Sequence, residues 1–242
     1  MLPAPVSSGR LPIESQPTDT TCGPTALHAV YRHWGLDVAL TELVQAVGTL
    51  PEGGTLGVML GLDALARGFA VTIHTCNLSV FDPSWFGARP ADLRERLEAY
   101  AAVNTEPKRA IAIEAYRRFL LAGGRVLMSD LSRDLLRLYL DRQAPLLTGL
   151  SATWLYRSAR ELPDTGEADD LRGEPTGHFV VLTGYDAVDD RVAVADPWKQ
   201  NPLDPGQHYH VQTERLLAAI LLGVITYDAN LVAVEPRPPS PA

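Results

Sequence analysis

A cysteine, a histidine, an aspartate and a glutamine stand in this chain where their side chains could act together on a carbonyl group. Cys22 lies in the stretch QPTDTTCGPTALHAVYRHW (16–34), between a polar run and an apolar run of helical period. A thiol at a helix start is pushed toward thiolate by the helix dipole, and a neighbouring imidazolium adds to that effect. We therefore interpret Cys22 as a nucleophile rather than as a small core residue.

The histidine and the aspartate lie in GHFVVLTGYDAVDDRVAVADPW (177–198), where two β-rich runs flank the polar turn DAVDD. This pattern predicts an antiparallel hairpin. A turn centred near Ala187 sets His178 opposite Asp196, and a register slip of two leaves them diagonal neighbours on one face. A carboxylate beside a histidine fixes the ring tautomer and stabilises the imidazolium, which is what activation of a thiol requires.

The glutamine completes the set. Attack of a thiolate on a carbonyl makes an oxyanion, which needs about two fixed hydrogen-bond donors. The backbone N–H of Cys22 is one candidate donor. The side-chain amide of Gln16, six residues earlier, is the other.

The elements that must position these residues favour an α+β fold. The first helix is expected from Cys22, with Thr20 or Thr21 as N-cap, Pro24 in the first turn and Gly35 at the C-terminal cap. Further helices are predicted at 40–47, 56–67, 91–102, 108–121, 132–142 and 213–221, and strands at 70–74, 145–150, 178–185, 192–196 and 230–234. Helices early and strands late are typical of α+β proteins rather than of alternating βαβ units.

Composition excludes several classes of protein. With 242 residues, 46% hydrophobic and 21% charged, the sequence is that of an ordinary globular domain. The net charge of -8 argues against a nucleic-acid binder. No apolar run reaches the length of a membrane span, and the N-terminus is not that of a signal peptide. Two cysteines allow at most one disulfide, so we expect a soluble protein in a bacterial cytoplasm.

Other candidate residues are given structural roles. Cys76 is expected to be buried filler beside a strand. His208 and His210 form an H-x-H pair near Asp204, but further ligands at sensible spacing are missing, so an exposed loop is expected and no metal or organic cofactor. The segment 160–175, with six acidic residues, is either a solvated loop or a lid that favours a basic substrate.

Three motifs together resemble those of the papain-like cysteine peptidases: Q-x5-C-G-P-T at 16–25, GHFVVLTGYD and VAVADPW. They resemble most closely the double-glycine-leader, bacteriocin-processing family, which is family thirty-nine of the cysteine peptidases, and its stand-alone members. The resemblance implies a papain-like fold, with the nucleophile at a helix start packed on an antiparallel sheet. It also implies that Cys22 attacks, His178 is the base, Asp196 orients it and Gln16 donates to the oxyanion.

The resemblance covers about residues 14–35 and 175–200. Because Cys22 and His178 are 156 residues apart, longer than in a compact leader peptidase, a helical insertion is expected at 75–150. The membrane and ATPase portions of transporter-fused members are not in this sequence, so cleavage after a double glycine is not carried over. We expect an extended arm at 1–15, a single domain at 16–235 and a disordered tail at 236–242.

The sequence therefore predicts a cysteine peptidase or amide hydrolase, which cleaves a peptide or isopeptide bond through a thioester. An acyl or peptidyl transferase with the same triad is the first alternative, because an amine can resolve the thioester in place of water. A non-catalytic peptide-binding module is the second. The natural substrate, the cleavage site and the oligomeric state are left open.

Overall fold

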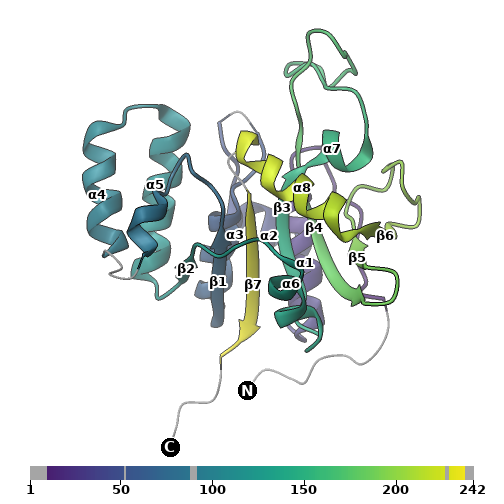
Figure 1. Cartoon of the computed structure of the whole chain (residues 1–242), viewed down its shortest axis with the longest axis horizontal. Coiled ribbons are helices and arrows are strands. Elements are labelled where there is room, and N and C mark those ends of the chain that lie inside the picture. The colour runs from purple at the N-terminus through teal and green to yellow at the C-terminus, as the bar shows by residue number, and fades with distance from the viewer. Residues whose placement is uncertain (1–9, 52, 88–91, 227–228, 238–242) are drawn as a thin grey trace, which may run out of the picture.

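A seven-stranded sheet runs through the protein in the order β2-β1-β7-β3-β4-β5-β6 (Figure 1). All neighbouring strands are antiparallel except β1 and β2, which are parallel. The computed structural model describes residues 10–51, 53–87, 92–226 and 229–237. The strands are β1 (Phe69–Thr75), β2 (Arg125–Leu127), β3 (Leu146–Ser151), β4 (Gly177–Asp186), β5 (Arg191–Ala195), β6 (His208–Gln212) and β7 (Asn230–Pro236).

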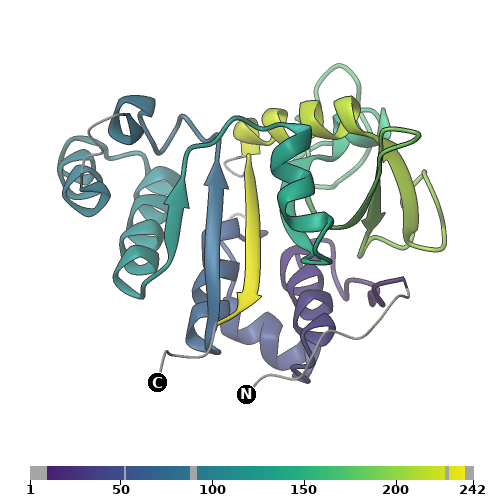
Figure 2. The ribbon, with the colours of Figure 1, turned by 60° about the horizontal axis from the view of Figure 1, so that its bottom comes forward.

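Helices cover both faces of this sheet. Figures 1 and 2 show α1 (Cys22–His33), α2 (Leu40–Val47) and α3 (Gly57–Ala66) on one face, and α6 (Arg133–Leu140) and α8 (Thr213–Leu222) on the other. A pair of helices, α4 (Leu93–Val103) and α5 (Pro107–Leu121), extends beyond the β2 edge. The short helical elements are η1 (Pro83–Phe86), α7 (Ala152–Tyr156) and η2 (Gly223–Thr226).

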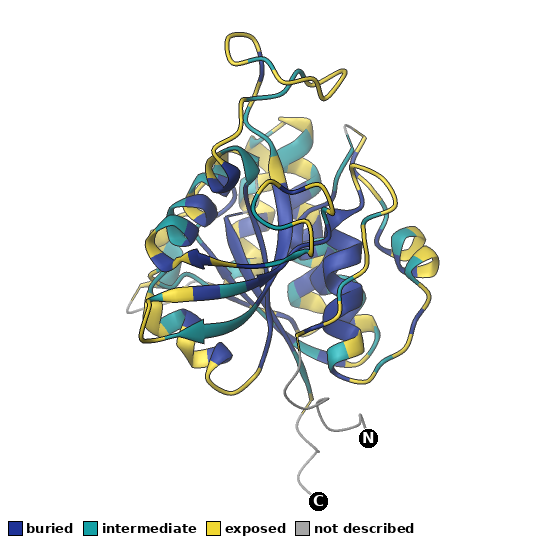
Figure 3. Cartoon of the chain, turned by 90° about the vertical axis from the view of Figure 1, so that its right-hand side faces the viewer, coloured by how far each residue is buried: buried dark blue, intermediate teal, exposed yellow. Residues whose placement is uncertain are grey.

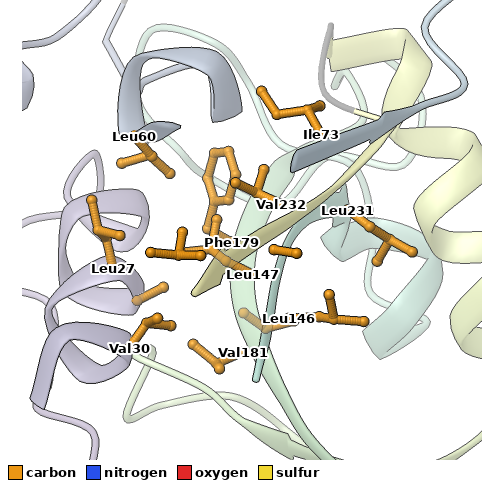
Figure 4. Close-up of a cluster of buried hydrophobic side chains, with 14 of the residues drawn as sticks. Leu27, Val30, Leu60, Ile73, Leu146, Leu147, Phe179, Val181, Leu231 and Val232 are labelled. Carbon is orange, nitrogen blue, oxygen red and sulfur yellow. The ribbon is translucent and has the colours of Figure 1, made fainter. Parts of the chain in front are cut away.

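The core lies between α1, α3 and the central strands. Residues 178–182 of β4 are buried in an unbroken run, as expected for a strand covered on both faces. Figure 4 shows Leu27 and Val30 of α1 gathered against Phe179 and Val181 of this strand. Each such side chain stabilises the fold by about 1.5–3 kcal/mol through burial of apolar surface. This packing fixes the start of α1 relative to β4.

The predicted α+β class is confirmed, with the N-terminal helices packed on a mainly antiparallel sheet. The 40–47 helix has the predicted bounds, and α1 ends with Gly35 at a φ of 74°, as a glycine cap requires. The helix predicted from Ala91 begins at Leu93, after the Asp92 side chain accepts from the Arg94 N–H, and Ala91 itself lies outside the described residues.

One expectation was wrong, and another holds for the position of a residue but not for its hydrogen bond. The residues around His208 and His210 form strand β6 rather than an exposed loop, because Tyr209 and Val211 alternate inward along a pairing with β5. Thr21 occupies the N-cap position of α1, but its hydroxyl does not cap the helix. Strands β2 and β6 and helix α7 were not predicted, since all are short.

The segment 75–150 contains η1, α4, α5, β2 and α6, and the domain boundaries stay a prediction. Of the expected arm and tail, residues 1–9 and 238–242 lie outside the described residues, and β7 runs on through Pro236. Within the described ranges, no helix has both the length and the apolar character needed to cross a bilayer.

Candidate active site

The start of α1 is built by a short turn that precedes it. The N–H of Thr21 and its hydroxyl both donate to the Thr18 carbonyl, at 3.2 and 2.8 Å, and the Thr18 N–H donates to the Thr21 hydroxyl at 3.0 Å. The turn thus uses the threonine that would otherwise cap the helix. Cys22 follows as the first helical residue, where backbone N–H groups have no carbonyl of the same helix to bond. Pro24 is tolerated there because its missing N–H is not needed.

Gly23 lets this helix start approach strand β4. A Cβ atom at Gly23 would stand 2.4 Å from Cγ2 of Thr55 and 3.3 Å from the ring of Phe179. Because Phe179 follows His178 directly, the residue after the cysteine packs on the residue after the histidine. The glycine in the Cys-Gly-Pro sequence is therefore a condition for the approach of the thiol to the imidazole.

The hairpin that carries His178 and Asp196 has a different register from the one predicted. Val181 pairs with Ala195 and Leu182 with Val194, and an irregularity between Leu182 and Gly184 then shifts the pairing by one residue. The prediction that His178 lies directly opposite Asp196 was therefore wrong. The register at the open end differs by two residues, which keeps both side chains on one face as diagonal neighbours.

His178 and Asp196 nevertheless form a direct ion pair. The Nε2 atom of His178 donates to Oδ1 of Asp196 at 2.8 Å. His178 is 8% exposed and Asp196 is fully buried. Since Asp196 occupies Nε2, the other ring nitrogen, Nδ1, is left for the thiol of Cys22, which is itself buried. The three predicted residues of the triad thus meet at one place.

The Asp196 carboxylate accepts four hydrogen bonds. The Trp198 N–H donates to Oδ1 at 2.8 Å, beside the bond from His178. The hydroxyls of Tyr156 and Tyr209 donate to Oδ2 at 2.6 and 2.7 Å. A buried carboxylate in a protein interior is tolerated when its lone pairs are satisfied in this way.

The pair is electrostatically coupled. Burial by itself lowers the pKa of His178, but the charge of Asp196 and the hydrogen bond to it, followed by those of Cys22, outweigh burial and raise this pKa to about 10. Burial by itself raises the pKa of Asp196, and His178, the Tyr156 hydroxyl and the Trp198 N–H lower it overall. Asp196 therefore favours the imidazolium form of His178.

A cavity of about 270 Å³ opens beside the histidine. Its lining includes Gln16, Tyr156, His178 and Trp198. The ring of Trp198 stands edge-on to the imidazole, with centroids 6.4 Å apart. The cavity gives a substrate a place next to the pair, with an indole partly covering the imidazole.

Gln16 lines this cavity and is tied to the segment that follows Asp196. Its backbone N–H donates to the Pro197 carbonyl at 2.9 Å. Its side-chain Nε2 donates to the Thr18 carbonyl at 3.1 Å, which sets the orientation of the amide and leaves the second Nε2 hydrogen available. The Oε1 atom is buried without a hydrogen-bond partner in the part of the chain that the structure describes.

The acidic segment predicted as a loop or lid connects α7 to β4. It projects from the body as a mostly exposed excursion (Figure 3), closed on itself by bridges of Glu161 to Ala168 and to Glu174. Glu161, Thr165 and Gly166 line the same cavity as His178, and Asp19 lines it as well. The loop therefore borders the candidate site.

Sequence reasoning missed three residues that contact the triad. Trp198 stood in a quoted motif without a role. Tyr209 is marked by the alternation in HYHVQ, whose inward positions are Tyr209 and Val211. No local pattern marks Tyr156, because only the tertiary fold brings its hydroxyl to Asp196.

The remaining candidates lie outside this cluster. Cys76 is a half-buried free thiol, 3.9 Å from the Ser129 carbonyl. The ring nitrogens of His208 contact the carbonyls of Gly206 and Leu11, at 2.9 and 2.8 Å, and so help to hold the N-terminal arm. Across the described ranges, histidine, cysteine and acidic side chains form no group of three that could hold a metal ion.

Comparison with known structures gives distant likenesses. The peptidase domain of Streptococcus ComA, described as a bi-functional ABC transporter involved in quorum sensing, is 13% identical over 94% of this chain and 100% of that chain, with a TM-score of 0.44. A C39-like peptidase from Bacillus anthracis is 13% identical over 94% and 96%, with a TM-score of 0.46. Xylellain, a cysteine protease from Xylella fastidiosa, is 16% identical over 98% and 88%, with a TM-score of 0.43.

No curated protein matches the chain. The model of the peptidase C39-like family matches residues 95–215, which is half of the chain. That match includes His178 and Asp196 and begins after Gln16 and Cys22. The chain belongs to the peptidase C39-like family.

Proposed function

We propose that the protein hydrolyses a peptide or isopeptide bond through a thioester on Cys22. The observation that carries this proposal is the buried His178–Asp196 pair, with Nε2 and Oδ1 2.8 Å apart and the thiol acting on the same imidazole. Such a pair holds a proton near a thiol at the start of a helix, which is the arrangement that generates a nucleophilic thiolate.

The proposed reaction has two stages. The Cys22 thiol passes its proton to His178, and the thiolate attacks the carbonyl carbon of the substrate. The oxyanion is bound by the Cys22 N–H and the Gln16 amide. The amide C–N bond breaks as the imidazolium protonates the leaving amine, and a thioester remains. Water, deprotonated by the imidazole, then attacks the thioester and releases the acid and the thiol.

Acyl transfer is the alternative, in which an amine attacks the thioester in place of water. The deep burial of the three triad side chains supports keeping this alternative, since a cleft that excludes water favours another acceptor. A binding module without chemistry needs no buried ion pair beside a thiol, so the His178–Asp196 pair argues against the second alternative.

A peptide library incubated in ¹⁸O-labelled water, with and without added primary amines, tests the proposal. Hydrolysis puts one ¹⁸O atom into each new carboxylate, whereas transfer yields an amide without it. We expect hydrolysis products by mass spectrometry. Absence of both kinds of product would contradict the proposal.

Replacement of Gln16 by alanine should lower kcat/KM about 100-fold, because one of two oxyanion donors is lost. The labelling rate of Cys22 by iodoacetamide should stay within about twofold of wild type, since that reaction forms no oxyanion. Gln45→Ala, an exposed glutamine of α2, is the control. A parallel fall of labelling and turnover in Gln16→Ala would indicate a distorted site instead.

The acidic loop predicts a preference for substrates with a cationic side chain. Burial, followed by the charge of Asp19, raises the pKa of Glu161, so two carboxyl groups border the cavity close to each other. Glu161→Gln should lower kcat/KM about tenfold for lysine-containing or arginine-containing peptides and leave neutral peptides unchanged. Glu167→Gln, on the exposed part of the same loop, is the matched control. Equal effects on both peptide classes would exclude charge recognition.

A further inference from the structure

Two tyrosine hydroxyls meet at one oxygen of the proposed orienting carboxylate. We infer that Tyr156 and Tyr209 are positioning residues, which hold Asp196 as an oriented anion and thereby set the acid limit of the range in which Cys22 is reactive. This inference rests on the proposed function, because it concerns the pair that would activate the thiol.

The geometry divides the carboxylate into two sides. Tyr156 reaches Oδ2 from the last residue of α7, and Tyr209 reaches it from β6, at 2.6 and 2.7 Å. Both tyrosines are buried. Because they occupy Oδ2, the other oxygen, Oδ1, is directed to Nε2 of His178. Rotation of the carboxylate would break several hydrogen bonds at once, so the pair is locked in one arrangement.

Charged and titratable groups approach Asp196 from every neighbouring element. His178 comes from β4, with Cys22 of α1 beyond it. The charge of Arg215, on α8, acts on Tyr209. Burial, together with the carboxylate, raises the pKa of each tyrosine well above its usual value, so both hydroxyls remain donors at neutral and acid pH.

The sign of the effect follows from which form the donors favour. Hydrogen bonds to a carboxylate stabilise the charged form and lower its pKa. Replacement of either tyrosine by phenylalanine therefore raises the pKa of Asp196, and the carboxylate becomes neutral at a higher pH. A neutral Asp196 no longer stabilises the imidazolium, so Cys22 loses reactivity there. One hydrogen bond to a charged group corresponds to a shift of about one pH unit.

The experiment measures iodoacetamide labelling of Cys22 by intact mass, from about pH 2.5 to pH 10, in a Cys76→Ala background. We expect the acid midpoint of the labelling profile to rise by about one unit in Tyr156→Phe and in Tyr209→Phe, and further in the double variant. Tyr185→Phe is the matched control, since its hydroxyl donates to Asp190 at 2.7 Å, at the other end of the hairpin. Its midpoint should equal that of the parent protein.

The outcomes separate this inference from the proposed function. A wild type without enhanced labelling at low pH overturns the proposed function. A wild type with that enhancement, and tyrosine variants whose labelling falls equally at all pH values with an unmoved midpoint, overturns the positioning role alone. Thermal melting of each variant, followed by circular dichroism, identifies any loss of fold, and the single variants then serve in place of the double one.

Discussion

Replacement of Cys22 by alanine is expected to abolish cleavage, with a fall in kcat of about 10⁴-fold or more. The proposed reaction passes through a bond to the sulfur, and alanine has no atom that can form it. The alanine also fills the site without a new polar group, so the buried His178–Asp196 pair is left in place. The measurement is cleavage of a peptide identified in the library, under single-turnover conditions. Only the wild type should form a thioester that can be trapped.

Cys76→Ala is the control for this result. Cys76 follows β1, which is separated from β4 by β7 and β3 in the sheet. Burial, followed by the charge of Asp130, raises the pKa of its thiol, so Cys76 is the less reactive kind of cysteine. Its replacement should leave kcat unchanged. If Cys22→Ala kept residual cleavage and replacement of Cys76 removed it, the assignment of Cys22 as the nucleophile would be contradicted.

Asp196→Asn is expected to lower kcat/KM by about 10³–10⁴-fold, although the side chain keeps its size. The amide carries no charge to stabilise the imidazolium. Its NH₂ group is a donor, and it would point at one of the four groups that donate to the carboxylate of Asp196, so that two donors would face each other. His178 would then lose the main influence that raises its pKa. The rate should be measured across pH, together with Cys22 labelling.

The same substitution should change how stability depends on pH. The pKa of His178 is raised to about 10, so the pair contributes fully below the ordinary value of 6.5 and this contribution is lost as pH rises toward 10. The pKa of Asp196 is lowered, so its contribution is present above the ordinary value of 3.8 and is lost as pH falls through the lowered pKa. Urea unfolding at about pH 6, 8 and 10 should show falling stability in wild type and a flatter profile in Asp196→Asn. Identical slopes would mean that the pair is not charged in the folded protein.

Much of the candidate site could be predicted from the sequence because its residues lie in short local motifs. Cys22 is marked by the start of an apolar helical period, and His178 and Asp196 by the two ends of one hairpin. The exact register could not be predicted, since the turn is centred beyond Ala187, where Asp186 pairs with Arg191, and the irregularity between Leu182 and Gly184 then shifts the pairing by one residue. The side-chain period of two kept the pair on one face despite that error.

The neighbours of Asp196 could not be predicted in the same way. Tyr156 lies at the end of a five-residue helix that has too few residues to show a period. Strand β6 was not predicted because the spacing of its two histidines is also that of metal ligands, whereas the inward residue between them is Tyr209. Donors to a buried carboxylate are chosen by the tertiary fold, so no spacing in the sequence identifies them.

The hydrogen bond from the Gln16 N–H to the Pro197 carbonyl joins segments that are synthesised at opposite ends of the chain. Contacts of such large sequence separation form late in folding, because the closure of a long loop costs entropy before it is rewarded. Cys22 emerges from the ribosome early, whereas its base and orienting residue come from β4 and the end of β5. The proposed nucleophile therefore has neither its base nor its orienting residue beside it until these distant segments of the chain have met.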